Sequence, residues 1–579
     1  MMSHPSCSID HLRTLLKRLD GHPFGEYQAL LDQTCRHKDF ALRLVYIQGS
    51  TGAFPASVGH LRVRQSLLRL PDSCLSNRAR ELATADYLLR TFQEAVVANT
   101  RPNRGARGSG SFQLLDLPPQ VLERNVVKFY PSEVRITFHV SLPGSGDNRI
   151  LGTQAARMLI DEAAAIVRAL AASTAEGVQL KTHCDVIEDW HFLQTRLPGH
   201  DMVAFVGDGA ILPRSAGDSQ APLGKGAVAF QAPDQMAVEI EFPNAGLMRG
   251  LGIRPGVNVL VGGGFHGKST LLNAVTKGVY PHIPGDGRER VVTHPQAVFI
   301  CSEEGRAVNG LDISGFMGSL PGGADPRKFQ TRNASGSTSE ASAIIEAVLA
   351  GARLLLIDED SSATNFLIKD QNMRLLIPED PITPLFDRVG ELYRTHGVST
   401  LIVVGGSSDY LGAARQVIAM RNYQPESITD RVASLKLPQP VKPAEPLKLV
   451  DRRRILPGNF NPAYHARRLG KTVGQRIKPL RLRERVLEYG DAQIDLSKLL
   501  ALVDPQQVLS LGYALLLAGQ KFNDRALSPS ALASALDGLV EKEGLEILSG
   551  IAKRPVFLAR PRQLELAGAI NRFRNLRIE

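Results

Sequence analysis

A glycine-rich octapeptide near the middle of the chain restricts its fold more than any other segment. Residues 262–269 read GGGFHGKS, which matches the GxxxxGKS pattern of a phosphate-binding loop. The β-rich run 257–261 precedes the loop, and residues 270–275 read as the start of a helix. Strand, glycine loop and helix in this order form the setting in which the pattern binds phosphate. The octapeptide therefore predicts an α/β nucleotide-binding domain.

The residues of this loop have distinct expected roles. Glycines let successive backbone N–H groups point at phosphate oxygens, and the helix N-terminus adds partial positive charge. Lys268 is expected to reach the β- and γ-phosphates, and the Ser269 hydroxyl to hold Mg²⁺. The alternative, a chance glycine-rich turn, is disfavoured by the complete pattern. The predicted nucleotide contacts here are Gly262, Gly263, Gly264, Phe265, His266, Gly267, Lys268, Ser269 and Thr270.

A second segment completes the expected nucleotide site. Residues 354–359 read LLLIDE, an apolar strand that ends in two carboxylates, as in a Walker B element. Asp358 is expected to hold Mg²⁺, directly or through water. Glu359 is expected to orient or deprotonate the attacking water. The alternative is a strand that merely ends at a charged turn, but the two segments come in the correct order.

Composition sets further limits. With 579 residues, 43% of them hydrophobic, the chain can form several cores, and we expect three domains. It contains no run of about 18 apolar residues, so no membrane span is predicted. Residues 1–12 have neither an apolar signal core nor the arginines of a transit peptide. The scattered cysteines form no CxxC pair and are predicted to be reduced thiols of an intracellular protein: Cys7, Cys35, Cys74, Cys184 and Cys301.

A possible metal-binding set lies around residues 183–191. His183, Cys184, Asp185 and His191 are potential ligands, but their spacing fits no zinc pattern. We therefore expect structural roles for them.

The periodicity and composition divide the chain into parts. Residues 1–222 are predicted to form an α+β domain, with a hairpin over 126–142 and a helix over 154–172. Within it, residues 101–111 are either a loop that contacts phosphate or a solvated surface loop. The ATPase domain is predicted at 223–436, a proline-rich linker at 437–446, and a basic, mainly helical region at 447–579. Leu-rich helices are expected there at 496–503, 508–518 and 530–540.

The positive charge of the chain is concentrated in residues 448–485. This block holds twelve Lys or Arg and two acidic residues, so its excess equals the net charge of +10 of the whole chain. Phe460, Tyr464 and Tyr489 lie among or near these cations, a combination that suits single-stranded RNA. The alternatives are a solvated charged surface and a basic arm docked on its own fold. The candidate RNA-binding residues are Arg452, Arg453, Arg454, Arg467, Arg468, Lys471, Arg476, Lys478, Arg481, Arg483 and Arg485.

Several further motifs resemble those of ATP-binding-cassette (ABC) ATPases. SGSTS at 335–339 resembles the signature motif, 360–365 the D-loop, and 401–410 the switch strand and its loop. Other blocks resemble one outlying soluble ABC-class family, which includes an ABC-ATPase associated with kinetoplastid mitochondrial RNA editing. They are FVGDGAILPR, YPHIPGDGRE, SGSTSEA, LLIDEDSSATNF and PRQLELAGAINRFR, and the resemblance covers nearly the whole chain.

This resemblance implies a toroidal homodimer that uses ATP and Mg²⁺ and has an electropositive central pore for RNA. It implies that Ser335, Gly336 and Ser337 of one subunit close over ATP held by the other. It also implies a mitochondrial setting in RNA editing or processing, with a cytoplasmic location as the alternative. The alternative function is a cassette that acts on a protein or a small molecule, with the basic block only structural.

The chain departs from the general cassette pattern in ways that affect catalysis. Ser408 replaces the switch histidine, Asn365 replaces the D-loop aspartate, and Ser337 replaces the second signature glycine. No glutamine is clearly placed for the Q-loop. A serine hydroxyl can bond a γ-phosphate but lacks the protonation chemistry of imidazole. We therefore expect slow turnover, with Glu359, Lys268 and Ser408 as the catalytic residues and ATP binding as a conformational latch.

Overall fold

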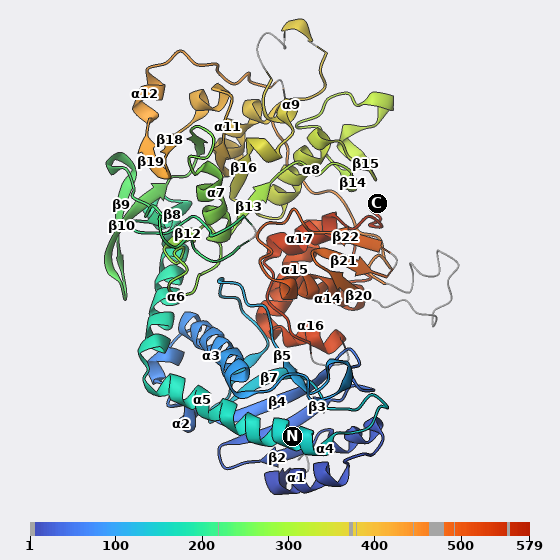
Figure 1. Cartoon of the computed structure of the whole chain (residues 1–579). Coiled ribbons are helices and arrows are strands. Elements are labelled where there is room, and N and C mark those ends of the chain that lie inside the picture. Colours follow the sequence, from blue (N-terminus) through green and yellow to red (C-terminus); the bar gives the residue numbers. More distant parts are fainter. Residues whose placement is uncertain are drawn as a thin grey trace. The chain divides into compact units, whose positions relative to one another are not determined.

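The structure, a computed structural model, describes residues 6–217, 219–369, 375–377, 379–443, 445–461, 480–490, 492–552 and 556–579. These residues form two compact units (Figure 1). The first reaches Glu188 and includes Ala552–Ala559, and the second comprises Asp189–Ile551 and Arg560–Glu579. Among the helices built from described residues, none combines the length and apolar character needed to cross a membrane.

The first unit is a seven-stranded sheet packed against helices. The sheet order is β1-β2-β3-β4-β7-β5, with β6 paired to β7. Its strands are β1 (Ser6–Ser8), β2 (Thr34–Arg36), β3 (Phe40–Tyr46), β4 (Ser57–Arg64), β5 (Ser111–Gln113), β6 (Val127–Phe129) and β7 (Glu133–Ser141). The helices are α1 (Ile9–Arg18), α2 (Gln65–Leu68), α3 (Arg78–Asn99), α4 (Gly152–Ala156), α5 (Ala163–Ala175) and the start of α6 (Val178–Arg196).

The local predictions for this unit are confirmed. The hairpin is formed by β6 and β7, and the predicted helix over 154–172 is α4 and α5 joined through a π-helical turn at Arg157–Glu162. In the 101–111 loop, Arg104 is buried and paired with Glu162. This arginine therefore holds the loop on the fold.

Two cysteines depart from the sequence prediction. Strand β1 pairs with β2 in parallel, which sets Cys7 opposite Cys35 with 4.6 Å between their Cα atoms. Their sulfurs form a disulfide, so the prediction of reduced thiols is wrong for this pair. Cys74, Cys184 and Cys301 are free and buried. Strand pairing joins residues 28 apart in sequence, which cysteine spacing alone does not reveal.

The second unit is built on a six-stranded sheet of order β13-β16-β17-β11-β18-β19. Strand β11 (Val257–Val261) lies at its centre, parallel to β17 (Ser399–Val403) on one side and to β18 (Gln416–Arg421) on the other. Strand β16 (Leu354–Asp358) lies between β17 and β13 (Ala297–Ile300), and β19 (Gln424–Ser427) closes the edge. The helices of this core are α7 (Lys268–Lys277), α8 (Gly336–Leu349), α9 (Thr364–Leu367), α11 (Leu385–His396) and α12 (Thr429–Ala433).

Two smaller sheets flank this core. One has the order β12-β8-β10-β9, and the other pairs β14 with β15. The strands are β8 (Ala204–Gly207), β9 (Ala237–Phe242), β10 (Gly246–Ile253), β12 (Val291–Thr293), β14 (Val308–Leu311) and β15 (Phe329–Thr331). Because β8 pairs with β10 and β12, residues 204–207 belong to the second unit, earlier than the predicted division at residue 222.

The described residues of the C-terminal region that belong to the second unit form a three-stranded sheet and four helices. These are β20 (Leu480–Arg483), β21 (Val486–Tyr489), β22 (Ala492–Asp495), α14 (Pro505–Lys521), α15 (Pro529–Glu543), α16 (Glu546–Ile551) and α17 (Gln563–Asn571). The helices predicted at 508–518 and 530–540 are α14 and α15. The helix predicted at 496–503 does not form. Asp504 caps α14 and Pro505 opens it, which fixes the helix start after this segment.

Candidate nucleotide-binding site

The phosphate-binding loop joins β11 to α7, as its sequence predicts. Gly262 and Gly267 both have positive φ, 141° and 96°, and both are closely packed. A Cβ added to Gly262 would lie 2.5 Å from the Met420 carbonyl oxygen, and one on Gly267 would lie 2.8 Å from the Tyr423 ring. The loop conformation therefore requires glycine at both positions. Phe265 stands at the tip and is almost fully exposed.

Lys268 lies folded into the curve of the loop. Its ammonium donates to the carbonyls of Gly262 and Gly263, at 2.7 and 2.9 Å. A positive charge held inside a ring of backbone amides matches the needs of a phosphate group. The loop and its lysine therefore fit the phosphates of a nucleotide.

The two predicted magnesium ligands come together from different elements. The Ser269 hydroxyl at the start of α7 donates to the Asp358 carboxylate at the end of β16, at 3.3 Å. Burial raises the pKa of Asp358, while the bond from Ser269 and the charge of Lys268 oppose this. Hydroxyl and carboxylate oxygens are ligands that Mg²⁺ accepts beside phosphate. The pair therefore fits a metal bound together with a nucleotide.

Glu359 is held by the loop that follows β17. Its carboxylate accepts from the N–H groups of Gly405 and Gly406, at 2.5 and 3.1 Å. In the same loop, Ser407 donates to Asp409 at 2.7 Å, while Ser408 is exposed. The loop thus fixes the carboxylate predicted to handle water, and the catalytic role of Ser408 stays a prediction.

The signature residues lie at the start of α8, where one of them is turned inward. Ser335 is the exposed N-cap residue, and its hydroxyl accepts from the Thr338 N–H at 3.4 Å. Ser337 is buried and donates to Asn365 at 2.8 Å. The Ser337 hydroxyl is therefore committed to a contact within its own chain. The contacts of Ser335, Gly336 and Ser337 with a nucleotide of another subunit stay a prediction.

A hairpin that sequence reasoning missed supports the phosphate-binding loop. Asn422 and Tyr423, between β18 and β19, both have positive φ. The Asn422 N–H donates to His266 Nδ1 at 2.8 Å, and the Tyr423 N–H donates to the His266 carbonyl at 3.0 Å. His266 is therefore bound to the hairpin. In the sequence, Asn422 could have indicated this turn, because asparagine is favoured in two-residue hairpin loops.

Glu340 was also missed. It is fully buried on α8, and its carboxylate accepts from the Ala363 N–H at 2.7 Å. Burial raises the pKa of Glu340 to about 7, despite that hydrogen bond and one with Ser362. The contact joins the signature helix to the segment that follows Glu359.

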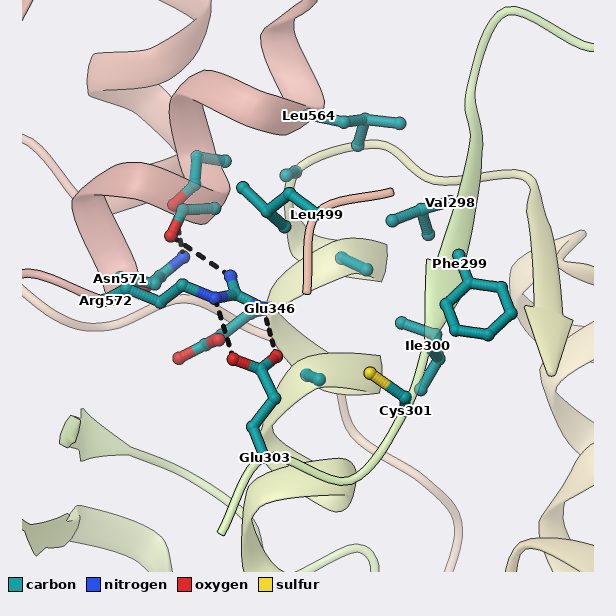
Figure 2. Close-up of a pocket in the computed structure, with 15 residues that line it drawn as sticks. Val298, Phe299, Ile300, Cys301, Glu303, Glu346, Leu499, Leu564, Asn571 and Arg572 are labelled. Carbon is teal, nitrogen blue, oxygen red and sulfur yellow. Dashed lines mark hydrogen bonds and ion pairs between the residues drawn. The ribbon is translucent and has the colours of Figure 1, made fainter. Parts of the chain in front are cut away.

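The C-terminal region meets the same core at a buried ion pair, shown in Figure 2. Arg572, just beyond α17, donates through Nε to Glu303 at 3.0 Å, and a second guanidinium nitrogen completes the pair. The Glu303 N–H donates to the Ser339 hydroxyl of α8 at 2.9 Å. Burial opposes ionisation of Glu303, but Arg572 and Arg306 outweigh it and lower the pKa of Glu303. A cavity of about 30 Å³ lies beside the pair.

Replacing Arg572 with alanine should destabilise the protein by about 3–5 kcal/mol, because it leaves the Glu303 carboxylate buried without its cation. The two side chains are only 9% and 10% exposed. Urea unfolding measures the loss. The double variant Arg572→Met with Glu303→Gln should recover most of it, since no unpaired charge remains. A loss below about 0.5 kcal/mol in the single variant, the size usual for surface positions, would contradict the assignment.

The basic block only partly matches its prediction. Arg453 is buried, pairs with Asp451 at 2.8 Å and donates to Asn571 at 2.9 Å. Its guanidinium holds α17, so its assignment to RNA is corrected. The neighbouring Arg452 and Arg454 are exposed. On β20, Arg481 and Arg483 are exposed, and in the turn that follows β20 Arg485 is half-buried. The other candidates lie outside the described residues: Arg467, Arg468, Lys471, Arg476 and Lys478.

The two aromatic residues of this region that the structure describes are not platforms for bases. Phe460 and Tyr489 are buried, and both pack on Phe573, with ring centroids 5.8 and 5.6 Å away. Tyr464 lies outside the described residues. Of the two expected contributions to RNA binding, phosphate contact and base stacking, the described residues therefore offer the first.

Two members of the possible metal-binding set make ion-pair contacts within the fold. His183 lies 3.1 Å from Asp86, and Asp185 pairs with Arg80 at 2.9 Å. Across the part of the chain that the structure describes, no group of three or more His, Cys, Asp or Glu is arranged to hold a metal ion.

Three family models match successive parts of the chain. The N-terminal model of ATPases of the ABC class matches residues 9–173, and the ABC ATPase P-loop domain model matches residues 176–451. The model of the MRB1590 C-terminal domain matches residues 482–579. Together these models span the two units and the C-terminal region.

The individual proteins that match this chain say less about its family than the family models do. The uncharacterized protein MJ1628 of Methanocaldococcus jannaschii is 32% identical over 189 residues, 32% of this chain and 41% of the relative. The match therefore spans less than half the length of that relative. Two structures of MJ1267, an ATP-binding cassette of an ABC transporter, are 14% identical, with TM-scores of 0.22 and 0.23. They cover 34% and 40% of this chain and 91% and 96% of their own, and scores this low support no conclusion.

Proposed function

We propose that this chain, which belongs to the ABC-class ATPases, binds ATP with Mg²⁺ at the loop around Lys268 and hydrolyses it slowly. The observation that carries the proposal is the convergence of three elements. Lys268 lies inside the phosphate-binding loop, and the Ser269 hydroxyl donates to Asp358. Glu359, the next residue after Asp358, is held by a backbone N–H of the loop that follows β17. Replacement of the switch histidine by Ser408 supports slow turnover.

Each of these residues has one task in the proposal. Lys268 exchanges the carbonyls of Gly262 and Gly263 for phosphate oxygens, and Ser269 and Asp358 hold the metal. A bound Mg²⁺ neutralises charge that develops on the phosphates. Glu359, oriented by two backbone N–H groups, positions the attacking water. Hydrolysis of radiolabelled ATP by the purified protein, with Mg²⁺ and with excess chelator, tests this assignment directly.

We further propose that the protein is a homodimer that binds RNA through a basic pore, in mitochondrial RNA editing or processing. The match to the MRB1590 C-terminal domain supports an RNA-editing context, and the exposed arginines 452, 454 and 481 supply phosphate contacts. One observation favours the second candidate, a cassette that acts on a protein or a small molecule. Arg453 shows that part of the basic block serves structure.

Replacing Arg452 and Arg454 with glutamine should weaken RNA binding by a similar factor for every sequence, because phosphate contacts carry no base information. The slope of the logarithm of the binding constant against the logarithm of the salt concentration, here called the salt slope, should become shallower by about 0.7 for each lost contact with a single strand. Fluorescence anisotropy with labelled RNA across a salt series measures both quantities. The matched control is Arg394→Gln with Arg431→Gln, which removes two charges from α11 and α12.

If the RNA affinity and the salt slope of the Arg452/Arg454 variant equal those of the wild type, these arginines do not bind RNA. That result would favour the second candidate function, a cassette that acts on a protein or a small molecule. ATP hydrolysis measured with and without RNA then distinguishes two proteins: one in which ATP binding acts as a conformational latch, and one that uses hydrolysis for remodelling. A latch shows no stimulation, whereas a remodelling enzyme turns over faster with RNA.

A further inference from the structure

Two sequence blocks that take no part in the proposed reaction come together in the second unit. They are residues 205–214 (FVGDGAILPR) and 280–289 (YPHIPGDGRE). The Ile211 N–H donates to the Gly287 carbonyl at 2.8 Å. Gly287 has a φ of 82°, and a Cβ added to it would lie 2.8 Å from the Ile211 carbonyl oxygen. The two blocks therefore pack backbone against backbone, which glycine permits.

This packing buries the Asp286 carboxylate between two partners. Arg214 donates to both of its oxygens, at 2.9 and 3.2 Å, and His282 Nδ1 lies 2.6 Å from it. Burial lowers the pKa of His282 against the opposing effect of Asp286, so this histidine is neutral at pH 7. Arg214 therefore already balances the charge of Asp286.

A second arginine is buried beside this pair and is bound to a neutral group. Arg288 donates through Nε and Nη2 to the Leu212 carbonyl, at 3.0 and 2.6 Å. Burial is the main cause that lowers the pKa of Arg288 to about 9, the charge of Arg214 adds to it, and Asp286 opposes it. Within the described part of the chain, the acid that acts on Arg288 is thus the one that Arg214 already binds.

Lys277 and Arg485 bring two more cations to this place. Lys277 lies in the last turn of α7, Arg485 follows β20, and both side chains are half-buried. Burial, with the charges of Arg288, Arg214 and Arg485, lowers the pKa of Lys277 to about 8. Burial also lowers the pKa of Arg485. Among the residues that the structure describes, neither side chain has a hydrogen-bond or ion-pair partner.

We call Arg214, Lys277, Arg288 and Arg485 the basic cluster. Four cations against Asp286 leave an excess of three positive charges. Several described side chains have nitrogen atoms that are buried without a hydrogen-bond partner, but none of these atoms belongs to the basic cluster. Its unbonded nitrogens therefore reach solvent, where an anion can meet them.

The charge excess is unfavourable unless an anion offsets it. Cations that are partly withdrawn from water lose hydration and repel one another. A lysine at a helix C-terminus gains from the helix dipole, which accounts for Lys277 but not for Arg288 or Arg485. A phosphate group suits such a cluster, because arginine can bind two of its oxygens at once and lysine adds a compact charge.

We propose that the basic cluster binds a phosphate group at a site separate from the phosphate-binding loop. Lys277, Arg288 and Arg485 contact its oxygens, while Arg214 stays bound to Asp286 and contributes charge. Lys268 and Lys277 are the first and last residues of α7, so roughly 14 Å of helix separates the two sites. The phosphate belongs either to a small phosphorylated molecule or to an RNA strand. The inference does not depend on ATP hydrolysis at the first site.

The test is equilibrium dialysis of the full chain against radiolabelled inorganic phosphate. Lys268→Ala, which impairs the phosphate-binding loop, should still bind phosphate. Adding Lys277→Gln and Arg485→Gln to this variant should weaken phosphate binding by at least about 10-fold, the effect of one lost hydrogen bond to a charged group. The matched control adds Lys521→Gln and Arg525→Gln instead, which removes a lysine from the last turn of α14 and an exposed arginine near it. The control should bind as Lys268→Ala does.

Thermal unfolding distinguishes a ligand site from a purely structural role. Phosphate should raise the unfolding temperature of Lys268→Ala more than that of the variant that also lacks Lys277 and Arg485, because only the first binds it at the cluster. An equal rise in both would overturn the proposal. Should the glutamine variant fail to fold, acetylation of the wild type decides. Phosphate should protect Lys277 from acetic anhydride but not Lys521, and an unprotected or unreactive Lys277 would overturn the proposal.

Competition identifies the source of the phosphate. Displacement of labelled phosphate by single-stranded RNA assigns the cluster to a strand, whereas displacement by glycerol phosphate and not by RNA assigns it to a small molecule. Two further outcomes separate the inference from the proposed function. Phosphate binding that is lost in Lys268→Ala alone overturns the inference and leaves the ATP site in place. Phosphate binding that persists in Lys268→Ala, in a protein whose wild type does not hydrolyse ATP, retains the inference and overturns the proposed function.

Discussion

Replacing Lys268 with alanine is expected to weaken ATP binding by roughly 10- to 100-fold and to abolish measurable turnover. A hydrogen bond to a charged group contributes about 1.5–3 kcal/mol, and each 1.4 kcal/mol corresponds to a factor of ten. In the structure this ammonium already lies inside the phosphate-binding loop, bound to the carbonyls of Gly262 and Gly263. Isothermal titration with ATP and Mg²⁺ measures the affinity.

The control for this prediction is Lys225→Ala, which removes an exposed lysine from a loop. It should leave ATP affinity unchanged. The Lys268 variant should keep most of its stability, because the two carbonyls that lose their partner lie at the edge of the loop and can bond water. ATP binding and turnover equal to those of the wild type would remove Lys268 from the site.

The nucleotide site could be predicted from sequence because its parts are local. A loop such as 262–269 depends on the φ angles of a few glycines and on the strand and helix at its ends, all of which neighbouring residues encode. The α/β class, the ABC-type core, the α+β N-terminal domain and the mainly helical C-terminal region are confirmed for the same reason. The periodicity of short segments indicated the N-terminal and C-terminal elements, whereas the ABC-type core was expected from the resemblance of several short motifs to those of ABC ATPases.

The content of charged and aromatic residues predicted the RNA-binding residues less well, because it does not reveal whether a side chain points to solvent or into the fold. Arg452, Arg453 and Arg454 are adjacent in sequence, yet the middle one points into the fold and its neighbours point to solvent. Phe460 was expected to stack on bases but packs on Phe573, more than a hundred residues further along the chain. A count of arginines and aromatics does not distinguish these cases.

Contacts between distant residues were not visible in the sequence at all. Arg572 and Glu303 are 269 residues apart, and Cys7 meets Cys35 only because two short strands pair in parallel. Ser337 illustrates the same limit on a smaller scale. Its place in the signature motif predicts exposure, whereas helix α8 turns it toward Asn365. Tertiary packing decided each of these outcomes.

Replacing Glu359 with glutamine is expected to slow ATP hydrolysis by roughly 10²- to 10⁴-fold, the usual contribution of a general base. ATP and Mg²⁺ should still bind, because Ser269 and Asp358 are unchanged. The glutamine carbonyl can accept from the N–H groups of Gly405 and Gly406 as the carboxylate does, so the loop should keep its position. Phosphate release under saturating ATP measures turnover, and titration with ATP measures binding.

The same variant tests the proposed latch, because slow hydrolysis prolongs the ATP-bound state. Light scattering should find the proposed dimer more persistent with ATP in Glu359→Gln than in the wild type. Asp360→Asn is the matched control, since it removes the next carboxylate along the chain, which is exposed, and should hydrolyse ATP at nearly the normal rate. Wild-type turnover in Glu359→Gln would show that another group handles the water. If the Glu359→Gln variant retains bound ATP but its dimer is no longer-lived, Glu359 keeps its catalytic role and the hypothesis that ATP binding acts as a latch is rejected.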